Sequence, residues 1–135
     1  MKAGTKLKKK HYILRSILII IVLIILVMIG VLIKSQLDMK KLAAIEIQDV
    51  NLSLIQDGYY EGSYKAFPIS VEVNVYVKNH EIKDIKILKH TNGQGSSAEK
   101  ITELILKSQS LEVDAISGAT YSSKVIIKAV EDALK

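Results

Sequence analysis

The pattern of apolar and polar positions divides the chain into one long apolar run and a region of mixed composition. Residues 17–33 are apolar throughout apart from Gly30, and no charge interrupts residues 16–33. A helix needs roughly 17–25 apolar residues to cross a bilayer, so the run predicts a transmembrane helix over residues 17–33. A cleaved signal peptide and a buried core helix are the alternatives. The run is longer than the roughly 7–15 apolar residues of a signal peptide, and a helix without a polar face needs a larger protein around it.

Residues 34–56 are expected to form a membrane-proximal spacer between this helix and a folded domain. Residues 37–47 suit a helix, whereas Val50, Leu52 and Leu54 alternate with polar residues and predict a short strand. The folded domain is expected to begin at Asp57 and to extend over residues 57–135.

Three strand patterns open this domain. Residues 59–64 are rich in tyrosine, and residues 69–77 alternate strictly between apolar and polar positions, which indicates a strand with one buried face. Asn79 and His80 suit a two-residue hairpin turn, because asparagine tolerates positive φ. Residues 81–90 then predict a third strand.

The third strand breaks its own alternation. Ile85 and Ile87 are expected to face the core, yet Ile82 and Leu88 fall on the opposite parity. This pattern predicts either a β-bulge or a strand covered on both faces.

Two helical patterns follow the strands. Ser96 or Ser97 can cap a helix that runs to about Ser108, and Ser122 or Ser123 can cap a final helix. The first has an apolar stripe of Ala98, Ile101, Leu104 and Ile105, and the second has an apolar face of Val125, Ile126, Ala129, Val130, Ala133 and Leu134. Lys124, Lys128, Glu131 and Asp132 are expected in solvent. The order of elements predicts an α+β fold, in which helices pack on one face of a small antiparallel sheet.

Charge orients the predicted membrane helix. Six of the 19 basic residues precede the apolar run and none of the 14 acidic residues does, so the net charge of +5 belongs to the N-terminal tail. Positive residues stay in the cytoplasm, so residues 1–16 are expected inside and the C-terminal domain outside, with a single pass across the cytoplasmic membrane. The tail can contact anionic lipid, whereas the domain has no basic surplus and a nucleic-acid partner is not expected.

The chain contains no cysteine, which excludes disulfides, thiolate metal sites and c-type haem. Its three histidines are scattered at positions 11, 80 and 90, and no metal site is expected. A redox role would therefore depend on an organic cofactor.

The decapeptide at residues 114–123 reads DAISGATYSS. It resembles the acceptor motif of bacterial FMN-binding domains, in which the threonine of Ser/Thr-Gly-Ala-Thr is esterified to the phosphate of FMN. The resemblance extends over residues 57–134 and includes the opening DGYYEG at residues 57–62 and the sequence QSLEV at residues 109–113. It implies that residues 57–135 are an FMN-binding domain with FMN on Thr120. Thr91 and Gly93 match a flavin-contacting Glu-Thr-Pro-Gly loop of relatives, whereas His90 and Asn92 do not.

The residues around Thr120 suit a phosphate. A helix is expected to start two residues later, and its unpaired N–H groups favour an anion. Gly118 and Ala119 let the backbone approach closely, and hydroxyl groups are available from Ser117, Ser122 and Ser123. Ser122 and Ser123 can equally be plain helix caps. Asp114 either orients the loop and takes part in recognition by a flavin transferase, or is an ordinary turn residue, and Tyr121 can stack on the flavin ring.

These features lead to the hypothesis of a membrane-anchored extracytoplasmic flavoprotein that carries electrons. It implies a flavin transferase as modifying enzyme and a membrane electron donor, such as a quinone or NADH oxidoreductase. No catalytic residue is assigned, because an electron carrier or redox-complex subunit fits better than a stand-alone enzyme. The alternatives are a module that binds FMN non-covalently, as sensor or store, and a structural subunit of a larger membrane complex.

Overall fold

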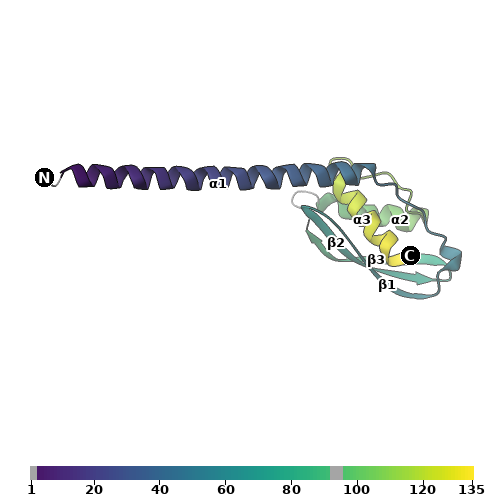
Figure 1. Ribbon diagram of the computed structural model, residues 1–135. Coiled ribbons are helices and arrows are strands. Elements are labelled where there is room, and N and C mark those ends of the chain that lie inside the picture. Colours follow the sequence, from purple (N-terminus) through teal and green to yellow (C-terminus); the bar gives the residue numbers. More distant parts are fainter. Residues whose placement is uncertain (1–2, 92–95) are drawn as a thin grey trace. The chain divides into compact units, whose positions relative to one another are not determined.

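The computed structural model describes residues 3–91 and 96–135 and begins with one continuous helix, α1, over Ala3–Ala44 (Figure 1). Residues His11–Leu42 of this helix are long and apolar enough to cross a membrane, a property that membrane anchors and signal sequences share. The most apolar part is not buried inside the protein. The chain separates into two units after Gln36, and the second unit, Leu37–Lys135, contains the sheet.

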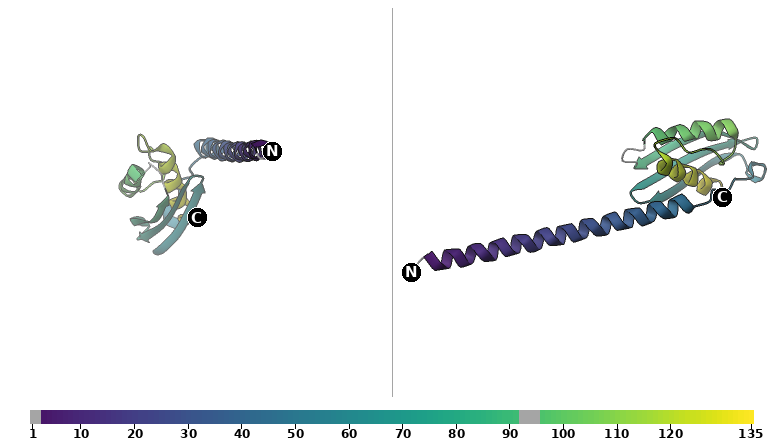
Figure 2. Two further views of the ribbon diagram at one scale, coloured as in Figure 1. Left: turned by 90° about the vertical axis from the view of Figure 1, so that its left-hand side faces the viewer. Right: turned by 90° about the horizontal axis from the view of Figure 1, so that it is seen from above.

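The second unit has the predicted α+β architecture. Strands β1 (Gly58–Ala66), β2 (Ile69–Lys78) and β3 (Glu81–Thr91) form an antiparallel sheet in the order β1-β2-β3. Helices α2 (Ile101–Ser108) and α3 (Thr120–Leu134) lie on one face of it (Figure 1, Figure 2). Asn79 and His80 form the expected two-residue turn, with φ values of 54° and 59° in the left-handed region.

Two bulges explain the broken alternation of β3. Val77 pairs with Ile82 and Tyr76 with Asp84, so Lys83 is an extra residue. A second shift between Glu72 and Val73 in β2 leaves Leu88 as an extra residue in β3. Because each bulge reverses the parity, Ile82 and Ile85 are both buried and Leu88 is 51% exposed. The bulge alternative is therefore confirmed.

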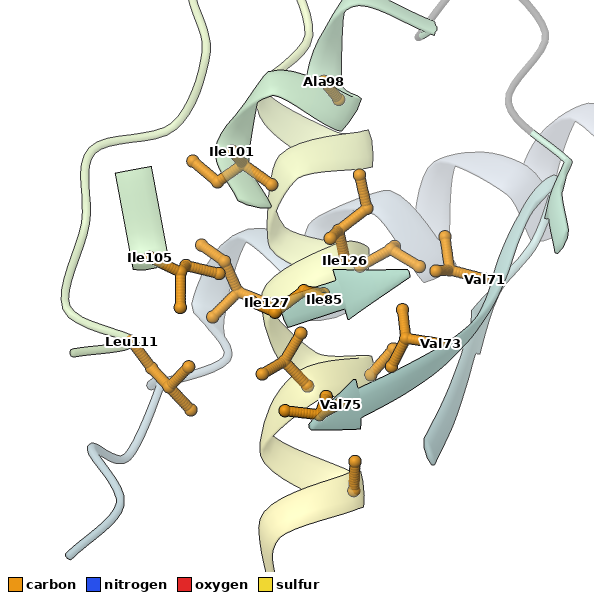
Figure 3. Packing of buried hydrophobic residues seen from close by; sticks show 14 of the residues in the cluster. Val71, Val73, Val75, Ile85, Ala98, Ile101, Ile105, Leu111, Ile126 and Ile127 are labelled. Atoms are coloured by element: carbon orange, nitrogen blue, oxygen red, sulfur yellow. The ribbon is translucent and has the colours of Figure 1, made fainter. Parts of the chain in front are cut away.

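The core lies between the sheet and the two helices. Figure 3 shows the inward side chains of β2 beside Ile126 and Ile127 of α3, with Ile101 and Ile105 of α2 completing the cluster. The inward residues of β2 are Val71, Val73, Val75 and Val77, all with 0% exposure.

Helix α3 packs closest on β1, at Gly62. A Cβ added there would lie 2.7 Å from the Cβ of Ala133 and closer still to the carbonyl oxygen of Ala129. Glycine at this position therefore lets the backbones of strand and helix meet.

Residues 37–56 pack against this core. Leu42 is fully buried, and Ile45, Ile47 and Val50 are partly buried against the cluster. The helix expected over residues 37–47 is the end of α1 and stops at Ala44. The strand expected at Val50, Leu52 and Leu54 is wrong: Leu52–Leu54 is a 3₁₀ helix, η1, because the Asn51 side chain accepts a hydrogen bond from Ser53 N at 3.1 Å.

Side chains bind backbone groups along both edge strands. Asp132 Oδ2 accepts from Ser63 N of β1 at 2.9 Å. At the other edge, the Gln109 side chain accepts from Ile82 N at 2.7 Å and donates to Ile82 O at 2.9 Å. Gln109 itself ends α2 with a left-handed φ of 54°.

The start of each helix differs from expectation. The helix expected from Ser96 or Ser97 to Ser108 is a 3₁₀ helix, η2 (Ser96–Lys100), followed by α2, whose N-cap is Lys100. Helix α3 begins at Thr120 after Ala119, with no side-chain cap, so the prediction that Ser122 or Ser123 caps it is wrong.

The polar face of α3 also differs from expectation. Asp132 is exposed as predicted, but Glu131 is only 1% exposed, and its carboxylate contacts Lys128 at 2.6 Å and also Lys135. Burial raises the pKa of Glu131, but the hydrogen bonds from the two lysines outweigh it and hold that pKa below its usual range. The expectation that Glu131 is in solvent is therefore wrong, because paired lysines let a carboxylate be buried on this face. Lys124 and Lys128 are half-buried.

Candidate functional site

The motif residues form a tight turn in front of α3. Ala119 N donates to Ile116 O at 2.9 Å, which closes a four-residue turn. Gly118, the third residue of the turn, has a φ of +78°, the value that a type II turn requires and that glycine adopts without strain. The sequence Ser-Gly-Ala-Thr thus has a local structural reason for its glycine.

Ser123 holds this turn onto the helix. Its hydroxyl accepts from Ile116 N at 3.0 Å and donates to Ala119 O at 3.0 Å, and the residue is fully buried. Ser122 is 2% exposed. The structure therefore places both serines inside the protein, whereas Thr120 lies outside.

Thr120 is the exposed first residue of α3, and Ser117 and Gly118 beside it in sequence are exposed as well. Ser123 N is the first helical donor, to Ala119 O, so the N–H groups of Thr120, Tyr121 and Ser122 precede the hydrogen-bonded helix. The first turn has no acidic residue. These groups and the positive end of the helix dipole favour a phosphate.

The backbone of the turn is accessible to a phosphate group. A Cβ added at Gly118 would meet no atom within 4 Å, so the backbone is open to a ligand there. Lys124 follows Thr120 by one helical turn and lies on the same side of α3. Tyr121 is 44% exposed and presents an aromatic ring beside Thr120.

Asp114 lies at a groove between α2 and the segment that leads into the motif. The groove has a volume of about 470 Å³ and is lined by Leu104, Lys107, Ser108, Glu112, Val113 and Asp114. Leu104 is 39% exposed and Val113 is half-buried, so the groove offers apolar surface beside an exposed carboxylate.

The predicted flavin-contacting loop is described in part. Thr91 is the exposed last residue of β3, and Gly93 lies outside the described residues. His90 points inward, with its side chain 3% exposed and Nδ1 2.9 Å from Glu99 Oε1 of η2. This contact joins the two sides of the loop, and the sequence pattern gave no signal for it because Glu99 belongs to the next element.

Across residues 3–91 and 96–135, no group of three His, Cys, Asp or Glu side chains is arranged to hold a metal ion.

Comparison with known proteins adds the family. The sequence matches the FMN-binding domain over residues 64–135, more than half of the chain. It is also 29% identical over 84 residues to an uncharacterized protein of Treponema pallidum (strain Nichols), in an alignment that covers 60% of this chain and 23% of that protein. The chain thus spans less than a quarter of this relative. The match over residues 64–135 includes both the turn before Thr120 and the helix behind it, and on this evidence the chain belongs to the FMN-binding domain family, with FMN as its cofactor.

Proposed function

We propose that this protein is a membrane-anchored flavoprotein that carries FMN on Thr120, outside the cytoplasm, and acts as an electron carrier. The observation that carries the proposal is the exposed Thr120 at the start of α3, directly after a turn that only a glycine enters without strain. Family membership supports FMN as the cofactor, and α1 supports the anchor.

The attachment step follows from the chemistry of the hydroxyl group. Thr120 Oγ1 loses its proton and bonds to the phosphorus of the FMN half of FAD, the pyrophosphate bond breaks, and AMP leaves. A threonine hydroxyl is a weak nucleophile without an adjacent base, so a flavin transferase has to supply the base. The exposure of Thr120 suits an acceptor that a second protein must reach.

Residues of α3 then hold the phosphoester. The N–H groups of Thr120 and Tyr121, the positive end of the helix dipole and the ammonium group of Lys124 favour its negative charge. Tyr121 offers an aromatic surface to the ring system. The bound flavin supplies the redox chemistry, and the protein supplies tethering and orientation.

Peptide mapping tests the site. The chain is made together with a flavin transferase and digested with trypsin, and the peptide of residues 108–124 should gain the mass of one FMN phosphoester. Thr120→Val should abolish the gain completely, whereas Ser117→Ala should retain it. A modification that persists in Thr120→Val would contradict the assignment. Yellow colour that leaves the polypeptide on denaturation would instead indicate non-covalent FMN.

Topology is a separate prediction. Six basic residues before the apolar helix favour an N-terminus inside and Lys135 outside. A reporter that is active only outside the cytoplasm should be active when fused after Lys135. Activity of a cytoplasm-only reporter at the same position would refute the extracytoplasmic role and, with it, electron transfer to partners on that side.

A further inference from the structure

The strongest feature that the proposed function leaves unexplained is Asp49. This residue lies between the end of α1 and η1, in the part of the chain that packs onto the core. Its Oδ1 accepts from Leu111 N at 2.9 Å, and its Oδ2 accepts from the Ser110 hydroxyl at 2.7 Å. The carboxylate thus joins two segments about 60 positions apart in sequence.

The contact falls at the start of the acceptor segment. Ser110 Oγ also accepts from Glu112 N at 3.0 Å, so the hydrogen bonds continue from Asp49 through Ser110 to Glu112. Leu111 is 1% exposed and Val113 N donates to Leu111 O at 2.9 Å. These bonds fix residues 110–113 although no regular secondary structure holds them.

The other end of the segment is fixed by Ser123, through Ile116 and Ala119. The motif residues are therefore held between two side chains, one from the N-terminal part of the unit and one from α3. Between these points Asp114, Ser117 and Gly118 remain exposed and open to a second protein.

The charge of Asp49 suits this role. Asp49 is exposed, and the loss of some of its hydration beside the segment of Leu111 raises its pKa, but the hydrogen bonds from Leu111, Ser110 and Val50 outweigh this and hold that pKa below its usual range. The side chain is therefore ionised at neutral pH and can accept all three bonds.

We infer that Asp49 is a positioning residue for flavin attachment: it orders residues 110–113 so that the transferase meets the motif in one conformation. This inference rests on the proposed attachment at Thr120. Asp49 lies outside the stretch that matches the family, in the same compact unit.

The test measures the kinetics of flavin attachment to the full-length chain in detergent, with a flavin transferase and FAD. The reaction is monitored by mass spectrometry, through the increase in mass of the chain. Asp49→Ala should raise the KM for the acceptor chain about tenfold with kcat unchanged, because a smaller fraction of molecules has the ordered segment. Asp49→Asn, whose amide oxygen can still accept from Leu111 N, should raise it less. In the double variant Asp49→Ala/Ser110→Ala, the increase in KM should be smaller than the product of the increases in the two single variants. The reason is that the two side chains belong to one chain of hydrogen bonds.

Two controls separate positioning from general loss of stability. Glu46→Ala removes an exposed carboxylate from the same segment, and Val77→Ala weakens the core of the sheet; both should keep the wild-type KM. A wild-type KM in Asp49→Ala, or an equal rise in Val77→Ala, overturns the inference and leaves the proposed function standing. If the wild-type chain gains no FMN at all, the proposed function fails and the inference fails with it. Asp49→Asn and Ser110→Ala keep the test decisive should Asp49→Ala fold poorly.

Discussion

The two ends of α3 are held in different ways. The C-terminal half meets β1 at Gly62, where the backbones almost touch, and Asp132 Oδ2 accepts from Ser63 N of that strand. The ion pairs of Glu131 with Lys128 and Lys135 lie along the helix itself. At the N-terminal end Thr120 and Tyr121 are exposed, whereas Ala119, Ser122 and Ser123 are buried, and the Ser123 hydroxyl joins the helix to the preceding turn.

The packed half of α3 thus supports the fold, and the exposed residue at its start is the one proposed to carry the flavin. A site is most precise when it is carried by a rigid element, and the packed half of α3 supplies that rigidity. The start of the helix can then be exposed to a modifying enzyme without loosening the fold. Substitutions in the packed half should therefore lower the stability of the protein, whereas substitutions at the start should mainly slow flavin attachment.

The largest expected effect is at Gly62. Gly62→Ala should lower the free energy of unfolding by about 3 kcal/mol or more, because the added methyl group overlaps Ala129 and Ala133. For a domain of this size the melting temperature should fall by roughly 12 °C or more. Gly58→Ala is the matched control, since its added Cβ would lie 3.8 Å from the nearest atom, in the Tyr60 ring. Equal melting temperatures for the two variants would contradict the close contact of α3 and β1.

A smaller effect is expected at Glu131. Glu131→Gln should cost about 1–3 kcal/mol, because the charge-assisted bonds to Lys128 and Lys135 weaken in a buried position. The pKa of Glu131 is lower in the folded protein than in the unfolded chain, so the folded state binds fewer protons and the contribution is complete above about pH 4.3. It should fade as the pH falls through the lower, folded value.

Thermal melts of wild type and Glu131→Gln over a series of pH values measure this effect. The difference in melting temperature should be constant near neutral pH and should shrink in acid. Glu103→Gln, at an exposed position of α2, should match the wild type throughout. A pH-independent difference would show that the packing of the side chain matters and its charge does not.

The smallest expected change in stability is at Ser123. Ser123→Ala should cost about 1 kcal/mol, since Ile116 N loses its acceptor, whereas Ala119 O keeps its bond from Ser123 N. Hydrogen exchange at Ile116 N should quicken, and flavin attachment should slow by more than the small change in melting temperature explains. Unchanged exchange at Ile116 would mean that the turn holds its shape without the hydroxyl.

Much of the fold was predictable because its signals are local. The alternation of Val71, Val73, Val75 and Val77 and the helical spacing of Val125, Ile126 and Ala129 correctly gave the buried faces. The bulges of the third strand were also predictable, because Ile82 and Leu88 break the alternation of apolar and polar residues along it.

The misses depend on contacts between distant residues or on competing local bonds. Serine near a helix start indicates a cap, but a serine hydroxyl can also bond back to the carbonyl four residues earlier, as Ser123 does to Ala119. Glu131 looks like a surface carboxylate until its lysine partners are known, and Asp49, which is exposed, gives no sign in the sequence of its bonds to residues 110 and 111. The apolar positions of residues 37–56 predict local elements, but a local pattern does not tell which distant surface these residues pack on.

The side chains on the two edge strands have a consequence for association. Exposed strand edges present unpaired N–H and C=O groups that another chain can join, and this is a common route to aggregation. Here Asp132 occupies Ser63 N on one edge, and Gln109 occupies both backbone groups of Ile82 on the other. The bulges at Lys83 and Leu88 also bend the β3 edge away from a straight template. A second copy that approaches either edge therefore meets backbone groups that are already bonded at Ser63 and at Ile82, and pairing at these two positions would first have to break those bonds.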